Sequence, residues 1–169
     1  MVLCAAFVAC CARAADKTVT NKELGFEITF PEAWQAVETP PKARVFCIKA
    51  PNEAGCKGSS NVSVIRYEVK ENEVLNDLVN EAKQGLKDDL KFFNVIEQIE
   101  FELAGVKAFK FIYVGEGTKT KDRFKISNYH LIKGTRGYII SAGGLEADFD
   151  KYAKDIDIIV KSFKLIDAK

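Results

Sequence analysis

Histidine is almost absent from this sequence: it occurs once, at His130, and tryptophan also occurs once, at Trp34. No G-x-S-x-G, H-x-x-x-H, C-x-x-C or calcium-loop spacing is present, so the usual signatures of nucleophilic and metal-assisted catalysis are missing. A histidine-dependent base or metal centre would have to use His130, which lies between Tyr129 and Leu131 without a spaced partner. We therefore predict no catalytic residue, no metal ligand and no cofactor, and a structural or surface role for His130.

An excess of one charge is also lacking. Lysine and arginine together number 25, aspartate and glutamate 24, and the two signs alternate along the chain. Such a balance gives no field that would attract nucleic acid or an anionic membrane. No apolar run approaches the roughly twenty residues that cross a bilayer. The sequence thus predicts neither nucleic-acid binding nor a transmembrane segment.

The first residues differ in character from the rest of the chain. Met1 is followed by small and apolar residues without any charge, and this stretch ends in Ala12-Arg13-Ala14. An apolar segment that ends in an Ala-x-Ala motif is typical of a secretory signal peptide, although a positive charge near its start is missing. We predict that residues 1–15 form a leader, cleaved after Ala14 or Ala15, and that residues 16–169 form a single domain.

A lipoprotein leader is the alternative. Cys10 follows Phe7-Val8-Ala9, a poor match to a lipobox, and its lipidation would anchor the protein to the envelope. Both interpretations place the mature protein outside the cytoplasm, as a periplasmic or secreted protein or one that is lipid-anchored.

Cysteine is scarce outside this leader, where only Cys47 and Cys56 occur. An even pair in an oxidising compartment favours a disulfide. The bridge would close a ten-residue loop, worth about 2.7 kcal/mol in the chain-entropy model. The alternative is a buried free Cys47 on a strand and an unrelated Cys56 in a loop.

The order of hydrophobic patterns predicts an α+β domain with an antiparallel sheet. Apolar residues recur at helical spacing over 74–91, where Asn72 is the expected cap, and again over 149–163. Several predicted strands are apolar on both faces, so we expect a helix on each face of the sheet. Three short strands are predicted within 24–50, of which 44–49 is the strongest, and further strands at 62–69, 95–103, 107–114, 124–132 and 138–142.

Three further features are better explained by a structural role than by catalysis or ligand binding. The segment 115–121 is glycine-rich but lacks a Gly-Lys-Ser/Thr core, which indicates a solvated hairpin loop. Trp34 is expected to anchor the core. Four aspartates in the last helical segment are expected on its solvent face rather than in a cation site: Asp148, Asp150, Asp155 and Asp157.

The order of the motifs resembles the PsbP-like superfamily. The matching features are Gly25-Phe-Glu-Ile-Thr-Phe-Pro-Glu-Ala-Trp34, the helix at 74–91, the strand at 105–113, Gly137-Tyr-Ile-Ile-Ser141 and Ile158-Ile-Val-Lys-Ser-Phe163. That group includes an extrinsic subunit of oxygen-evolving photosystems, Ran-binding Mog proteins and small exported bacterial proteins. The resemblance implies an α/β/α sandwich and non-enzymatic interaction roles. No residue matches a Ran-binding surface or a photosystem docking segment.

We therefore predict an exported, monomeric, non-enzymatic module that binds a protein or a small ligand at a sheet edge or an inter-helix groove. Contacts are expected from loops 52–60 and 115–122. Two alternatives remain: a metal-dependent or hydrolytic enzyme that combines His130 with nearby carboxylates, and a lipid-anchored structural envelope protein.

Overall fold

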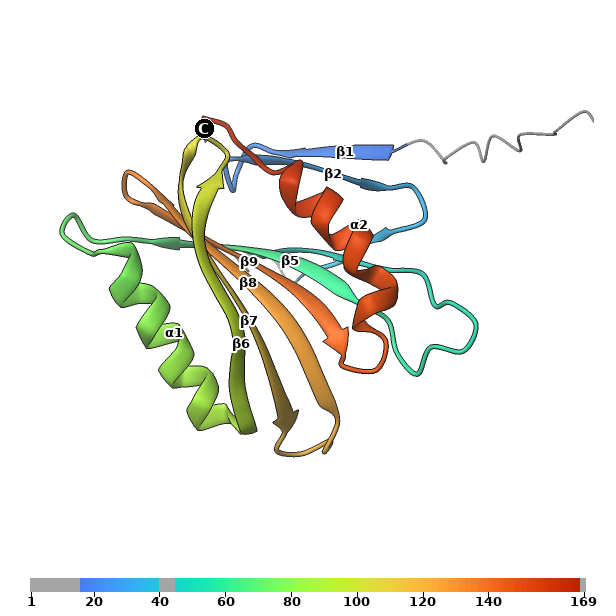
Figure 1. Cartoon of the computed structure of the whole chain (residues 1–169). Coiled ribbons are helices and arrows are strands. Elements are labelled where there is room, and N and C mark those ends of the chain that lie inside the picture. Colours follow the sequence, from blue (N-terminus) through green and yellow to red (C-terminus); the bar gives the residue numbers. More distant parts are fainter. Residues whose placement is uncertain (1–15, 40–44, 168–169) are drawn as a thin grey trace, which may run out of the picture.

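The computed structural model describes residues 16–39 and 45–167, so the predicted leader with Cys10 and its cleavage site lies outside the described residues. Within this part the chain forms ten strands and two helices (Figure 1). In chain order they are β1 (Asp16–Asn21), β2 (Phe26–Pro31), β3 (Gln35–Val37), β4 (Val45–Lys49), β5 (Asn61–Glu68), α1 (Leu75–Asp89), β6 (Leu90–Leu103), β7 (Val106–Gly117), β8 (Arg123–Lys133), β9 (Arg136–Leu145), α2 (Phe149–Lys161) and β10 (Lys164–Leu165).

The main sheet has seven antiparallel strands in the order β3-β4-β5-β9-β8-β7-β6. Strands β6 to β9 form the predicted meander. Its first turn contains Ala104 and Gly105, with φ values of 54° and 75°, and two successive positive φ angles suit the twist of a hairpin. Strand β6 is an edge strand, and its register with β7 shifts between Lys91 and Asn94 and between Val95 and Glu97. Phe92, within the first irregularity, has a φ of 53° and a side chain that is 71% exposed.

One face of this sheet carries α2 and a second, three-stranded sheet in the order β1-β2-β10. Alternate residues of β2, namely Phe26, Ile28 and Phe30, are buried in the main core. Trp34 joins them: it is 1% exposed, and its Nε1 donates to Asp155 of α2 over 3.1 Å. The tryptophan is therefore a core anchor, as predicted.

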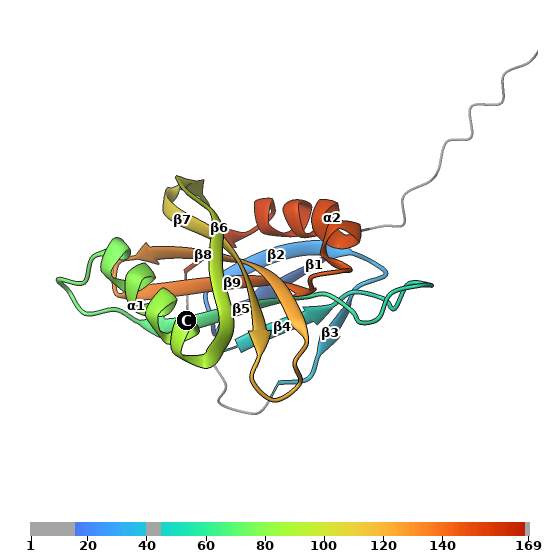
Figure 2. The same ribbon diagram turned by 60° about the horizontal axis from the view of Figure 1, so that its bottom comes forward.

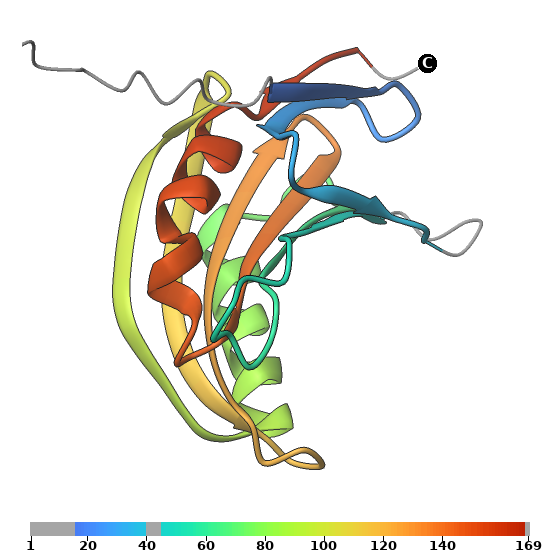
Figure 3. The ribbon, with the colours of Figure 1, turned by 90° about the vertical axis from the view of Figure 1, so that its right-hand side faces the viewer.

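The opposite face carries α1, and Figures 2 and 3 show the two helices on the two sides of the meander. Val79 is the one fully buried residue of α1, and it packs on Phe111 and Tyr113 of β7. Helix α1 begins after Val74, which makes no side-chain capping bond, so the expected cap at Asn72 is wrong. No helix among the described residues is long and apolar enough to span a membrane.

The predicted fold class is confirmed in part. The strands are antiparallel and the two helices lie where the periodicity placed them. However, the segment at 24–31 leaves the main sheet and pairs with β1 and β10, so sheets dominate the molecule more than a simple helix-flanked sandwich implies. Residues 16–21 add a strand, because the Lys-Thr-Val-Thr sequence pairs along the exposed edge of β2.

Candidate functional site

His130 is buried in the interface between the main sheet and α1. It is 1% exposed, its ring stacks on Phe111 with centroids 5.5 Å apart, and neither ring nitrogen has a hydrogen-bond partner among the described residues. Burial, assisted by the charge of Lys83, lowers its pKa to about 4. No group of three or more potential metal-ligating side chains was found in the described segments. His130 is thus a neutral buried residue in this structure.

The predicted disulfide between Cys47 and Cys56 is not formed in this structure, where both are free thiols. Cys47 lies on the α1 side of the sheet, where its Sγ is 3.3 Å from the hydroxyl of Ser63. Cys56 lies on the α2 side, with its Sγ 3.3 Å from Lys151 Nζ and 3.5 Å from the Tyr152 hydroxyl. The intervening sheet separates the two sulfur atoms. Cys47 lies on a strand and Cys56 in a loop, as in the alternative, but Cys47 is half-buried rather than buried.

The four aspartates of the last helical segment do not form one set. Asp148 is buried, and its Oδ2 accepts hydrogen bonds from the backbone N–H groups of Lys57 and Gly58 at 2.9 and 3.1 Å. Its expected place on the solvent face is therefore wrong: it fixes the 50–60 loop to α2. Despite burial, which acts in the opposite direction, these hydrogen bonds lower the pKa of Asp148. The hairpin loop predicted at 115–121 is shorter than expected, because residues 115–117 end strand β7 and pair with β8. The turn that follows is closed by the Gly117 N–H, which donates to the Asp122 carbonyl oxygen.

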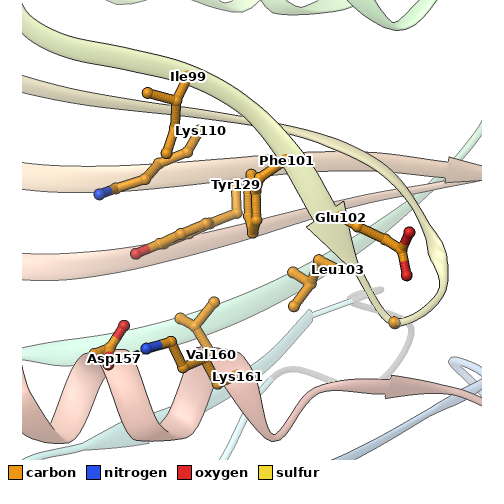
Figure 4. Close-up of a pocket in the computed structure, with 10 residues that line it drawn as sticks. Ile99, Phe101, Glu102, Leu103, Lys110, Tyr129, Asp157, Val160 and Lys161 are labelled. Carbon is orange, nitrogen blue, oxygen red and sulfur yellow. Dashed lines mark hydrogen bonds and ion pairs between the residues drawn. The ribbon is translucent and has the colours of Figure 1, made fainter.

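A cavity of about 340 Å³ lies between α2 and the end of the β6–β7 hairpin. Figure 4 shows residues of the strands facing residues of α2 across this space. Its walls are apolar at five positions, Ile99, Phe101, Leu103, Ala104 and Val160, and polar at five others, Glu102, Lys110, Tyr129, Asp157 and Lys161. We call it the α2–β6 cavity.

The charges around the α2–β6 cavity are largely neutralised. Lys110 Nζ is 2.7 Å from Glu97 Oε1, and Lys161 Nζ is 2.8 Å from Asp157 Oδ2. Burial raises the pKa of Tyr129 to about 12, so its phenol stays neutral and can donate a hydrogen bond. The cavity suits an apolar group with one polar contact.

The sequence did not predict this cavity. Its lining comes from segments more than fifty residues apart, and no local spacing joins β6 to α2. The only local signal is the alternation of Ile99, Phe101 and Leu103, which marks one apolar face of a strand but not what that face meets.

The sequence matches the family described as PsbP-like protein over residues 12–165, which includes both helices and both sheets. This chain belongs to the PsbP-like family. No curated protein is similar enough in sequence to count as a relative.

Solved structures share the fold of this PsbP-like chain at low sequence identity. Cyanobacterial PsbP (CyanoP) from Synechocystis sp. PCC 6803 is 17% identical, with a TM-score of 0.63 over 93% of this chain and 96% of that one. LpqN of Mycobacterium tuberculosis, described as involved in cell envelope biogenesis, is 13% identical, with a TM-score of 0.66 over 90% and 91%. The Ran-binding protein Mog1p of Saccharomyces cerevisiae is 9% identical, with a TM-score of 0.62 over 91% and 97%. At these identities the likeness establishes the fold alone.

Proposed function

We propose that this PsbP-like protein is an exported, non-enzymatic module that binds another protein through the α2–β6 cavity. The observation that carries the proposal is the position of this cavity, which lies directly beside an edge strand of the main sheet. An edge strand presents backbone groups to a partner, and an adjacent apolar cavity can take a side chain from it. A small ligand in the same cavity is the alternative.

The side chains of β6 support a protein partner. Ile96 and Ile99 are large apolar side chains on this edge strand, and they are 50% and 46% exposed. The side chain of Ile99 also forms part of the apolar wall of the cavity, together with Phe101. A partner that covered Ile99 and inserted an apolar side chain would remove this exposed surface from water, at about 25 cal/mol for each Å² buried.

The environment of His130 supports a non-catalytic role. A general base works best with a pKa near the operating pH, and burial holds the pKa of His130 at about 4. The fold of the Ran-binding protein Mog1p shows that this architecture can serve protein binding. We propose export on the basis of the Ala12-Arg13-Ala14 motif, with lipidation of Cys10 as the alternative and a monomeric state in solution.

Two matched variants test the binding site. Ile99→Lys places a charge at the cavity wall, whereas Ile96→Lys introduces the same change on the same strand outside the cavity lining. In pull-downs from the envelope fraction of the source organism, we expect Ile96→Lys to capture the same partner as wild type and Ile99→Lys to lose it. Equal capture by both variants, or equal loss, would reject the α2–β6 cavity as the binding site.

A further inference from the structure

A second cavity lies on the opposite face of the main sheet, beneath α1. Its volume is about 170 Å³, enough for several water molecules or one small organic molecule, since a water molecule occupies about 30 Å³. Strands β5, β8 and β9 form its floor and α1 forms its wall. The residues that line it are Tyr67, Leu78, Glu81, Ala82, His130 and Ile139. We call it the α1 cavity.

The floor of the α1 cavity contains polar atoms without partners. Both ring nitrogens of His130 and the hydroxyl oxygen of Tyr67 are buried, and none of them has a hydrogen-bond partner among residues 16–39 and 45–167. Each buried polar group left unpaired costs roughly 1–3 kcal/mol. Three such atoms around one cavity are unusual, because buried polar groups in native proteins are nearly always satisfied.

Packing fixes the positions of the His130 and Tyr67 rings. Its ring stacks on Phe111, and Phe111 in turn packs in the cluster around Val79. The Tyr67 ring lies over Gly137 of the neighbouring strand, where any side chain would collide with it: a Cβ at this position would be 2.3 Å from the Tyr67 ring. Both polar side chains are therefore held at the cavity by their neighbours.

We infer that the α1 cavity binds a small uncharged molecule that carries an amide or hydroxyl group on an apolar body. A neutral imidazole offers one donor and one acceptor, and the Tyr67 hydroxyl offers both, so the ligand must supply both kinds of group. Leu78, Ala82 and Ile139 give the apolar walls. An anionic ligand would meet the carboxylate of Glu81, which also lines the cavity, and a cationic ligand would have to leave water to reach the uncharged atoms of the floor.

Helix α1 covers the cavity with one fully buried side chain, Val79, while Leu75 and Leu86 are partly buried against the same cluster. Because the His130 nitrogens are shielded from solvent, we expect the ligand to reach them through an outward shift of this helix. This inference concerns a different face of the molecule from the α2–β6 cavity and does not depend on the proposed function.

The single histidine provides the assay, because its Hε1 signal in an NMR spectrum needs no assignment. The probes are benzamide, benzoate and benzylamine, which are similar in size and differ in charge. We expect benzamide to shift the His130 signal in a saturable manner and the two ionised probes to leave it unchanged. If benzamide causes no saturable shift, water alone occupies the cavity and the inference is rejected.

Three variants locate the binding. Tyr67→Phe removes one hydroxyl from the cavity and should weaken benzamide binding about tenfold, whereas Tyr129→Phe removes a hydroxyl from the opposite face and should leave binding unchanged. Ala82→Leu fills the cavity and should abolish the shift. If binding survives Ala82→Leu, or if both tyrosine variants bind equally, the probe occupies another place and the inference fails.

Discussion

Acidification between pH 6.5 and pH 4 is expected to destabilise this protein through the buried His130. Burial lowers the pKa of this side chain from 6.5 to about 4 in the folded protein. Between these two values the unfolded chain binds a proton that the folded protein excludes, so stability falls as the pH falls. From pH 7 to pH 5 the free energy of unfolding should decrease by about 2 kcal/mol from this residue.

Urea denaturation at pH 7 and pH 5 measures this loss. The matched variant is His130→Leu, which fills the same place in the interface with an apolar side chain that cannot titrate. Carboxylates contribute equally to both proteins, so the difference between their pH dependences isolates the histidine, and we expect about 2 kcal/mol less loss in the variant. An identical pH dependence of wild type and variant would show that His130 is hydrated or paired in solution.

Three further predictions concern the core, the thiols and the leader. Ile156 is 2% exposed on the sheet-facing side of α2, so Ile156→Asp should cost several kcal/mol and greatly lower the melting temperature; an unchanged melting temperature would contradict the position of α2. Cys47 and Cys56 are free, and iodoacetamide should label both in denatured, unreduced protein, whereas a mass two daltons lower without labelling would reveal a bridge. Intact-mass analysis of natively expressed protein should give an amino terminus at Ala15 or Asp16, and a chain that retains its first residue would contradict export.

The sequence predicted the helices and strands better than it predicted which of them contact one another. The stripe of Tyr152, Ile156 and Val160 requires a helix with one buried face, whatever that face contacts. In contrast, the alternation of Phe26 and Ile28 defines a strand with one apolar face but does not say which strands pair with it. That choice depends on contacts with β10, which is more than 130 residues away in the chain.

The candidate sites show the same limit. The spacing of Cys47 and Cys56 allows a bridge, and only the alternation of side chains in β4 together with the path of the following loop places the sulfur atoms on opposite faces. The helical period placed Asp148 on the solvent face. In the structure its carboxylate accepts a hydrogen bond from the backbone N–H of Lys57, which is distant in the sequence. Neither cavity has a sequence signature, since each arises where a helix crosses a curved sheet.

The irregular register of β6 sets a length limit on any strand that joins this sheet. A flat edge of fourteen residues would be a template for indefinite addition of further copies of the chain. The register shifts before Glu97 interrupt that template, because a bulge twists the edge away from a straight partner. What remains continuous is Glu97 to Leu103, a run of roughly 20 Å, and it is this half that borders the α2–β6 cavity. In the proposed binding mode, the same irregularity that discourages fibre-like association would limit the pairing of a partner strand to the stretch from Glu97 to Leu103.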